Sequence, residues 1–200
     1  MQKITNEAAN KRFKSIFEIG SGGFGSVDKV YDNARKDLCA IKKIPNSQSS
    51  DQLLREITFL QKLKHQNIIT FNEAFNVNDD LWISMEYCPY GCISNYKDIM
   101  TEKLVLCIIR DVANALQYLH SNDIIHSDVK PTNVLFSSTC EIKVADFGVS
   151  HYAHSISVLQ TGEKDGSPLY MAPEMIKGKP IGIPVDIWAL GITAFEMLVG

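Results

Sequence analysis

The hydrophobic pattern of the chain changes its period at Pro89-Tyr90-Gly91, and this change constrains the fold more than any other feature of the sequence. Before it, apolar runs of strand length alternate with turn residues, and one helical stretch lies among them. After it, apolar residues recur every three or four positions, a spacing typical of amphipathic helices. Proline and glycine interrupt both patterns, so we expect a joint between two domains here. The sequence predicts an α+β fold in two parts.

These patterns place the individual elements. The predicted strands are 13–19, 27–31, 38–44, 68–77 and 81–87, with turns at 32–37 and 78–80. A helix capped by Ser50 or Asp51 is predicted to run to about Lys64, and its apolar face consists of Leu53, Ile57, Leu60 and Leu63. The predicted helix from Thr101 to Ser121 has an apolar face made of Leu104, Ile108, Val112, Ala115 and Leu119.

Composition narrows the class of protein. The 200 residues carry 20 Lys and Arg against 23 Asp and Glu, a net charge of −3, and 45% are hydrophobic. This balance excludes a disordered polyelectrolyte and gives no reason to expect nucleic acid or a membrane as a partner. The five cysteines lack metal-binding spacing, which predicts reduced thiols. The N-terminal residues form no secretory signal, and the longest apolar stretch, Ile187–Val199, is too short for a membrane span. We therefore expect a cytoplasmic or nuclear protein.

A glycine-rich loop follows the first predicted strand. Gly20-Ser21-Gly22-Gly23-Phe24-Gly25-Ser26-Val27 matches the pattern Gly-x-Gly-x-x-Gly-x-Val. Such glycines also serve ordinary turns, and alone they leave nucleotide binding and a plain turn equally open. A dinucleotide-binding loop should open a helix, whereas the residues after Gly25 are β-type. The loop is therefore predicted to join two strands of a hairpin, where its backbone N–H groups can approach phosphates closely.

Lys42 lies inside the apolar strand Cys39-Ala40-Ile41-Lys42, where a lysine taken alone is expected to point to solvent. The position of Glu56 indicates instead that the Lys42 side chain is paired with a carboxylate. This glutamate is three residues after Leu53 and four before Leu60, so the predicted helix places it on the apolar face. A carboxylate there is costly unless it is paired, and Lys42 is a suitable partner. Such an ion pair beside the glycine loop could hold nucleotide phosphates.

The polar residues with the clearest chemistry lie in the second part of the chain. Asp128, Lys130 and Asn133 fall within six residues, in a segment that Pro131 keeps from being helical. Eighteen residues after Asp128, Asp146-Phe147-Gly148 follows an apolar strand. A carboxylate and an amide oxygen suit Mg²⁺, which prefers hard oxygen ligands. A second carboxylate can accept a hydroxyl proton, and a lysine can neutralise a migrating phosphoryl group.

Taken in order, these motifs resemble the eukaryotic protein kinase family over residues 13–200. The series continues with Ala172-Pro173-Glu174, and 186–191 resembles the family's helix that anchors the catalytic loop through Asp186. The resemblance implies a two-lobed α+β fold after an N-terminal extension of residues 1–12. The implied parts are a small antiparallel-sheet N-lobe with one helix (13–87), a hinge (86–91) and a mainly helical, incomplete C-lobe (92–200).

The resemblance also implies a role for each motif residue. Asp128 would take the proton of the substrate hydroxyl, Lys130 would stabilise the transferring phosphoryl group, and Lys42 would contact the α- and β-phosphates. ATP and Mg²⁺ are the implied cofactors, with the metal held by Asn133 and Asp146. The implied nucleotide-binding residues are Ile19, Gly20 to Val27, Ala40, Lys42, Glu56, Met85, Glu86, Cys88 and Leu135.

Two segments bear on the substrate. Residues 130–133 and 166–174 resemble the serine/threonine type of kinase, with Ser167 in place of the commoner threonine. The implied partner is a protein with a serine or threonine acceptor, and Ser167 keeps a hydroxyl for Asp128 and Lys130. The alternative is a kinase-fold binding module without catalysis. Such modules lose the strand lysine, the catalytic aspartate or the metal aspartate, and all three are present here.

Ser127 departs from the family pattern, which implies an arginine at this position. That arginine binds a phosphorylated activation segment through paired N–H donors and a fixed charge, which serine lacks. We predict that activity does not depend on such a phosphate, although Ser155, Ser157 and Thr161 are available for modification. Phosphatase treatment of the pure enzyme should leave its activity unchanged. Loss of activity, restored by re-phosphorylation of that segment, would contradict the prediction.

Overall fold

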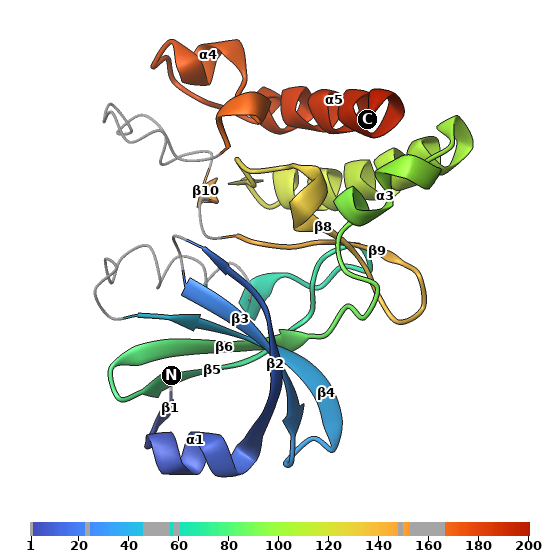
Figure 1. The fold of residues 1–200 in the computed structure, drawn as a ribbon. Coiled ribbons are helices and arrows are strands. Elements are labelled where there is room, and N and C mark those ends of the chain that lie inside the picture. Colours follow the sequence, from blue (N-terminus) through green and yellow to red (C-terminus); the bar gives the residue numbers. More distant parts are fainter. Residues whose placement is uncertain (1, 23–24, 46–56, 58–60, 148–149, 153–166) are drawn as a thin grey trace. The chain divides into compact units, whose positions relative to one another are not determined.

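The structure is a computed structural model that describes residues 2–22, 25–45, 57, 61–147, 150–152 and 167–200. The chain divides into two units, shown in Figure 1. Unit 1 comprises Met1–Leu63 and Ile69–Cys88, and unit 2 comprises Lys64–Ile68 and Pro89–Gly200. The boundary after Cys88 lies next to the Pro89-Tyr90-Gly91 tripeptide at which the hydrophobic pattern changes.

Unit 1 is built on a six-stranded sheet with the order β1-β5-β6-β4-β3-β2. The strands are β1 (Gln2–Ile4), β2 (Phe13–Gly22), β3 (Gly25–Asp32), β4 (Asp37–Ile44), β5 (Phe71–Val77) and β6 (Asp80–Glu86). Four pairings are antiparallel as predicted, whereas β1 adds a parallel strand beside β5. The predicted turn between β5 and β6 is confirmed: Asn78 and Asp79 have φ angles of 48° and 72°, as a tight two-residue hairpin requires.

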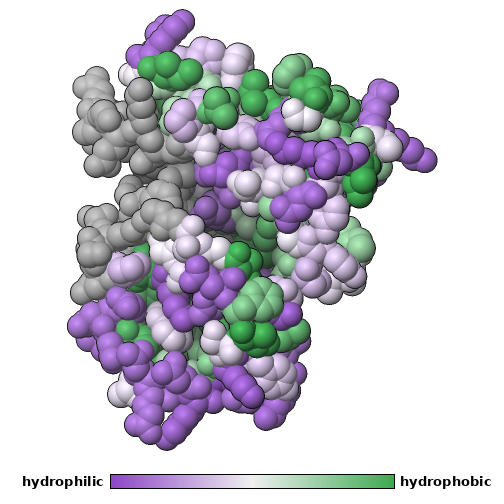
Figure 2. All heavy atoms as spheres, viewed as in Figure 1, coloured by the Kyte–Doolittle hydropathy of each residue, from purple (hydrophilic) through white to green (hydrophobic). Residues whose placement is uncertain are grey.

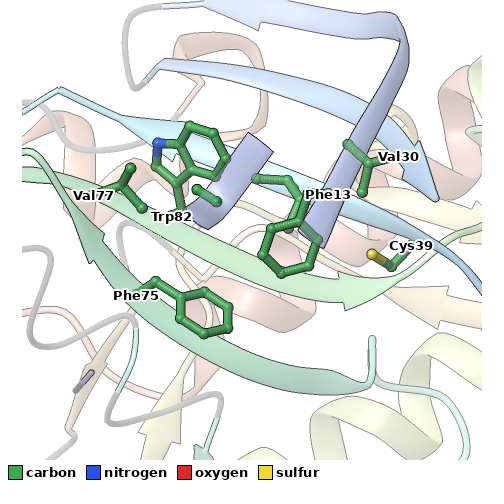
Figure 3. Packing of buried hydrophobic residues seen from close by; sticks show 8 residues of the cluster. Phe13, Val30, Cys39, Phe75, Val77 and Trp82 are labelled. Carbon is green, nitrogen blue, oxygen red and sulfur yellow. The ribbon is translucent and has the colours of Figure 1, made fainter. Parts of the chain in front are cut away.

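The N-terminal residues belong to this sheet. Helix α1 (Asn6–Arg12) begins after Thr5, whose hydroxyl accepts from the Ala8 N–H at 3.2 Å, a regular N-cap. No helix or strand was predicted for residues 1–12. In the structure, Ala9 is fully buried in a cluster whose other side chains come from β2 to β6. Figure 3 labels several of these side chains, among them Phe13, Phe75 and Trp82. Phe13 and Phe75 meet edge to face there, with their ring centroids 5.5 Å apart.

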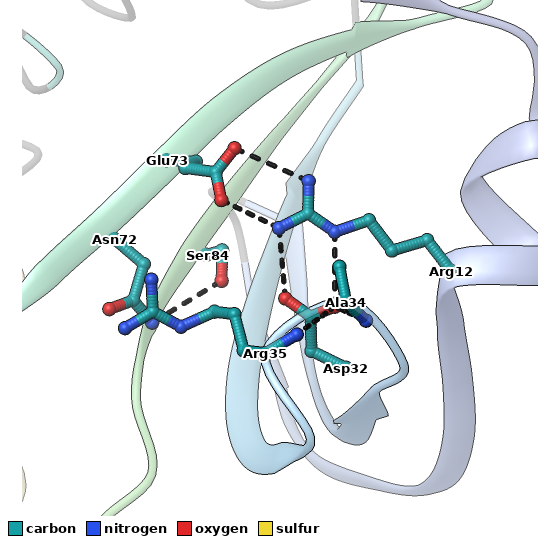
Figure 4. A network of polar contacts seen from close by, with 7 residues as sticks. All are labelled: Arg12, Asp32, Ala34, Arg35, Asn72, Glu73 and Ser84. Carbon is teal, nitrogen blue, oxygen red and sulfur yellow. Dashed lines mark hydrogen bonds and ion pairs between the residues drawn. The ribbon is translucent and has the colours of Figure 1, made fainter.

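Arg12 connects α1 to two strands of the sheet (Figure 4). Its Nε and Nη2 donate to the two oxygens of Asp32 at 3.0 and 2.9 Å, and its guanidinium also donates to Glu73 at 2.6 and 3.3 Å. The same guanidinium lies 4.8 Å from the Phe13 ring centroid and 5.0 Å from that of Phe75. Burial by itself would raise the pKa of Asp32, but hydrogen bonds from Arg12 and the Ala34 amide outweigh it and the pKa is lowered.

Unit 2 combines helices with short strands. Its helices are η1 (Ile93–Ile99), α3 (Glu102–His120), η2 (Pro131–Asn133), η4 (Pro168–Tyr170), α4 (Pro173–Ile176) and α5 (Pro184–Val199). Its strands form two antiparallel pairs, β7 (Ile124–Ile125) with β10 (His151–Tyr152), and β8 (Val134–Phe136) with β9 (Ile142–Val144). The start of α5 packs on β7 and α4 through Val185, Ile125 and Ala172.

Helix α3 confirms the helix predicted from Thr101 to Ser121, but its buried face is rotated slightly from the predicted apolar face. Leu104 was expected in the core and is 36% exposed, while Val105 is buried at 2%. The first turn contacts its surroundings through Val105 because the packing of the whole helix, from Ile108 to Leu119, sets the rotation. The predicted helix from Ser50 to Lys64 lies largely outside the described residues.

Residues 64–68 pack with unit 2 although strands of unit 1 follow them. Ile68 forms a bridge with Val144, and the Asn67 side chain donates to the Ile142 carbonyl at 3.1 Å. The ring of His65 stacks on Tyr118 at 5.0 Å between centroids. The connection into β5 is thereby tied to β9 and α3.

Helix α5 exposes much of its apolar surface, and hydrophobic patches lie over this part of the molecule in Figure 2. The exposed large apolar residues of α5 are Ile187, Trp188, Phe195, Leu198 and Val199. Among the described residues, no helix is long and apolar enough to cross a membrane. The five cysteines all lie within the described part of the chain and form no disulfide there.

Replacing Arg12 with methionine should lower the free energy of unfolding by about 3 kcal/mol, because fully buried Asp32 would lose its cation. The control Lys11→Met removes only an exposed i,i+4 pair with Glu7 and should cost less than about 0.5 kcal/mol. Since the pKa of Asp32 is lowered on folding, its contribution is complete above the ordinary carboxyl pKa and is lost as the pH falls through the lowered value. Urea denaturation at neutral and acidic pH measures both effects. Equal stability of the two variants at neutral pH would contradict this assignment.

Candidate active site

One buried carboxylate holds the loop between β7 and β8. Asp186, in the first turn of α5, is fully buried and accepts three hydrogen bonds. Its oxygens accept from the backbone N–H groups of His126 and Ser127 at 2.9 and 2.8 Å, and from His120 Nε2 at 2.8 Å. A carboxylate removed from water is costly unless donors surround it, so these contacts set the path of the loop.

The loop directs Asp128 into a cluster of donors. Asp128 Oδ2 accepts from Lys130 Nζ at 2.7 Å and from Asn133 Nδ2 at 3.0 Å. Asp128 Oδ1 accepts from the backbone N–H of Ser167 at 3.0 Å. Asp128 is only 7% exposed. The structure thus brings together three of the residues selected from the sequence, at hydrogen-bond distance from one another.

Ser167 contacts both Asp128 and Lys130, but not through the atoms that were expected. Its hydroxyl was expected to bond both Asp128 and Lys130. Lys130 Nζ does donate to the Ser167 hydroxyl at 2.6 Å, but the bond to Asp128 comes from the Ser167 amide. The contact with Lys130 therefore needs the hydroxyl of residue 167, whereas the contact with Asp128 needs only its backbone N–H.

Two residues of the candidate site have a strained backbone. Ser127 and Asp146 have φ angles of 67° and 65°, in the left-handed region that non-glycine residues rarely adopt. The Ser127 Oγ is buried without a hydrogen-bond partner in the described part of the chain. Fully buried His126 donates from Nε2 to the Ala145 carbonyl at 3.1 Å, and its ring is tilted by 59° against that of Phe147, with the ring centroids 4.9 Å apart. Its Nδ1 accepts from the Asp128 amide at 3.3 Å, so both contacts select one ring tautomer.

Asn133 and Asp146 are the predicted ligands of a magnesium ion. The Asn133 side chain donates its N–H groups to the backbone and side-chain oxygens of Asp128, which leaves its amide oxygen as the group to face a cation. Asp146 contributes a carboxylate. Together they offer two hard oxygens, few enough that water and phosphate oxygens would complete the shell, as Mg²⁺ favours. The donor set therefore fits the ion.

Lys42 lies in unit 1 on β4, opposite Val27 on β3 and Ile83 on β6. It is 8% exposed, which excludes the alternative of a strand lysine that faces solvent. A buried ammonium requires a polar environment. Its expected partner, Glu56, lies outside the described residues.

The glycine loop lies at the end of the β2–β3 hairpin, as predicted, with Gly22 paired to Gly25. Ile19, Gly20 and Ser21 are exposed on β2, and Ser26 and Val27 are half-buried on β3. Gly23 and Phe24 lie outside the described residues. Gly25 has a φ of 114°, and a Cβ there would lie 2.0 Å from the Lys43 carbonyl oxygen. Glycine is thus required at position 25 by the fold.

The remaining nucleotide-binding candidates are divided between the two units. In unit 1, Ala40 pairs with Met85 across β4 and β6, and Cys88 is buried just after β6. The Glu86 amide donates to the Thr70 carbonyl at 2.9 Å, so a hinge contact from Glu86 would use its carbonyl. In unit 2, Leu135 lies on β8 and bridges Cys92.

The sequence matches the protein kinase domain family over residues 13–200, which is nearly the whole chain. The chain belongs to the protein kinase family. The family expected from the motifs is confirmed, and with it the mixed α/β kinase fold with an N-lobe sheet.

Several curated relatives are named as serine/threonine kinases. "Serine/threonine-protein kinase pakG" of Dictyostelium discoideum is 38% identical over 90% of this chain and 15% of its own length. "Serine/threonine-protein kinase cst-1" of Caenorhabditis briggsae is 35% identical over 99% of this chain and 42% of its own. "Serine/threonine-protein kinase STE20" of Debaryomyces hansenii is 34% identical over the full chain and 19% of its own. The chain is thus similar to proteins named as serine/threonine kinases, and it spans less than half the length of each of them.

Sequence reasoning missed several residues that hold the site. His120 ends α3, and nothing in its local pattern marks it as a partner of Asp186. Lys97 and Tyr170 both donate to Glu196 on α5. The one available signal for Glu196 was a charged residue inside the apolar stretch Ile187–Val199.

Glycine at position 25 should be far less replaceable than glycine at position 20. Gly25→Ala should lower the free energy of unfolding by about 2 kcal/mol or more, because the side chain meets backbone and φ is positive. The control Gly20→Ala has nothing within 4 Å of the new Cβ and should shift stability by less than about 1 kcal/mol. Urea denaturation of both variants measures the difference. Equal losses would contradict this account of the hairpin.

Proposed function

We propose that the protein transfers the γ-phosphoryl group of ATP to serine or threonine hydroxyls of protein substrates, as a step in a signalling cascade. One observation carries the proposal: the Asp128 carboxylate lies within hydrogen-bond distance of Lys130, Asn133 and Ser167. A carboxylate held beside a cation can accept a hydroxyl proton while the cation meets the charge of a phosphoryl group. The names of the curated relatives support serine or threonine as the acceptor.

In this mechanism Asp128 orients the acceptor hydroxyl and takes its proton. The acceptor oxygen forms a bond to the γ-phosphorus as the bond to the β–γ bridging oxygen breaks, and ADP leaves with that bond's electron pair. Lys130 Nζ, 2.7 Å from Asp128 Oδ2, stabilises the charge on the transferring group. Lys42 contacts the non-transferring phosphates. Mg²⁺, held by Asn133 and Asp146, would neutralise phosphate charge when bound.

Two further expectations remain proposals. We propose that the glycine loop covers the phosphates, and that Val27 and Ala40 contact the adenine. We also propose a cytoplasmic or nuclear location, on the grounds of the reduced cysteines and of the composition.

Transfer of labelled γ-phosphate to a randomised serine/threonine peptide library tests the proposal. Asp128→Ala should lower kcat by at least about 10²-fold, the usual contribution of a positioned base, while ATP affinity is retained. Lys42→Ala should weaken ATP binding and turnover together. The exposed Lys103→Ala is the matched control and should keep wild-type turnover.

Equal, near-zero turnover in the wild type, Asp128→Ala and Lys42→Ala would refute the proposed catalytic activity. It would favour a kinase-fold binding module instead. Phosphate found on tyrosine alone would refute the proposed acceptor.

A further inference from the structure

Glu196 on α5 connects two segments of unit 2 that are far apart in the sequence. One carboxylate oxygen accepts from Lys97 Nζ, on η1, and the other accepts from the Tyr170 hydroxyl, on η4. Lys97 and Glu196 are half-buried, with 33% and 24% of their side chains exposed. The pair is therefore more shielded from water than a typical surface salt bridge.

Tyr170 is joined to the candidate catalytic carboxylate by a single turn of chain. The Tyr170 amide donates to the Ser167 carbonyl at 2.9 Å, closing η4. At the other end of this turn, the Ser167 amide donates to Asp128 at 3.0 Å and its hydroxyl accepts from Lys130 at 2.6 Å. One short 3₁₀ turn thus runs between Glu196 and Asp128, held at both ends.

The local electrostatics favour an ionised Glu196 carboxylate and a protonated Tyr170 hydroxyl. Burial would raise the pKa of Glu196, but hydrogen bonds from Lys97 and Tyr170 outweigh it and lower the pKa. Burial and the adjacent Glu196 raise the pKa of Tyr170, so its hydroxyl remains a donor at neutral pH. Without Lys97, the half-buried carboxylate would lose the cation that offsets its desolvation and the contact that orients it toward Tyr170.

We propose that Lys97 is a positioning residue: by holding the Glu196 carboxylate against Tyr170, it fixes η4 and so keeps Ser167 in place beside Asp128 and Lys130. This inference rests on the proposed phosphoryl transfer and adds to it a residue remote in sequence from every catalytic motif. Lys97 acts through Glu196 and Tyr170, and its loss should affect the chemical step more than ATP binding.

The test compares Lys97→Met, Lys97→Arg and Glu196→Gln in the full chain, with the exposed Lys103→Met as matched control. Lys97→Met should lower kcat for a peptide substrate by about tenfold, a loss of ~1.4 kcal/mol of transition-state stabilisation, with the KM for ATP unchanged. Lys97→Arg keeps a cation and should retain kcat within about twofold. Lys97→Met/Glu196→Gln should lose no more than the worse single variant, because both changes interrupt one chain of contacts.

Amide hydrogen exchange at Ser167 gives a readout that does not depend on activity. Exchange should be faster in Lys97→Met than in the wild type and in Lys103→Met, because the amide loses its fixed acceptor at Asp128. A wild type without kinase activity would refute the proposed function, while faster exchange in Lys97→Met would still support the linkage. Wild-type exchange in Lys97→Met, an unchanged kcat, or additive losses in the double variant would overturn the inference.

Discussion

The candidate site depends above all on one desolvated charge, the carboxylate of Asp186. Its full burial in the first turn of α5 makes every donor it receives necessary, and two of the three are backbone N–H groups of the loop after β7. If those N–H groups pointed elsewhere, the buried carboxylate would be left without donors. The loop is therefore forced to adopt a positive φ at Ser127. The position of Asp128, the next residue, follows from this constraint.

Asp128 is then held from two directions. From within its own loop, Lys130 and Asn133 donate to one carboxylate oxygen. From the segment 167–170, a backbone amide donates to the other. Helix α5 supports both sides, since Asp186 near its start orients the loop and Glu196 near its end binds Tyr170. One rigid helix thereby aligns two segments that are separated by about 35 residues of sequence, which is the kind of support that a preorganised site needs.

In unit 1, the sheet and its hairpins were predictable because their signals are local. Alternating apolar residues and the turn at Asn78-Asp79 encode neighbouring antiparallel strands directly. The parallel pairing of β1 with β5 was not predictable, because a three-residue strand has no periodicity of its own and its partner lies about 70 residues away. Separations of 20 and 61 residues likewise hide the ion pairs of Arg12 with Asp32 and Glu73, which tie α1 to the sheet.

The sequence by itself determined the family, the order of the strands from β2 to β6 and the close spacing of Asp128, Lys130 and Asn133, since spacing and residue type are local properties of the chain. Only the tertiary structure decided which neighbours those residues have. Packing set the rotation of α3 that buries Val105 in place of Leu104, and it brought the Ser167 amide, not its hydroxyl, to Asp128. It also brought Lys97 and Tyr170 to one carboxylate. These outcomes depend on contacts between distant segments, whose geometry is fixed by close packing of the whole unit and leaves no periodic trace in the sequence.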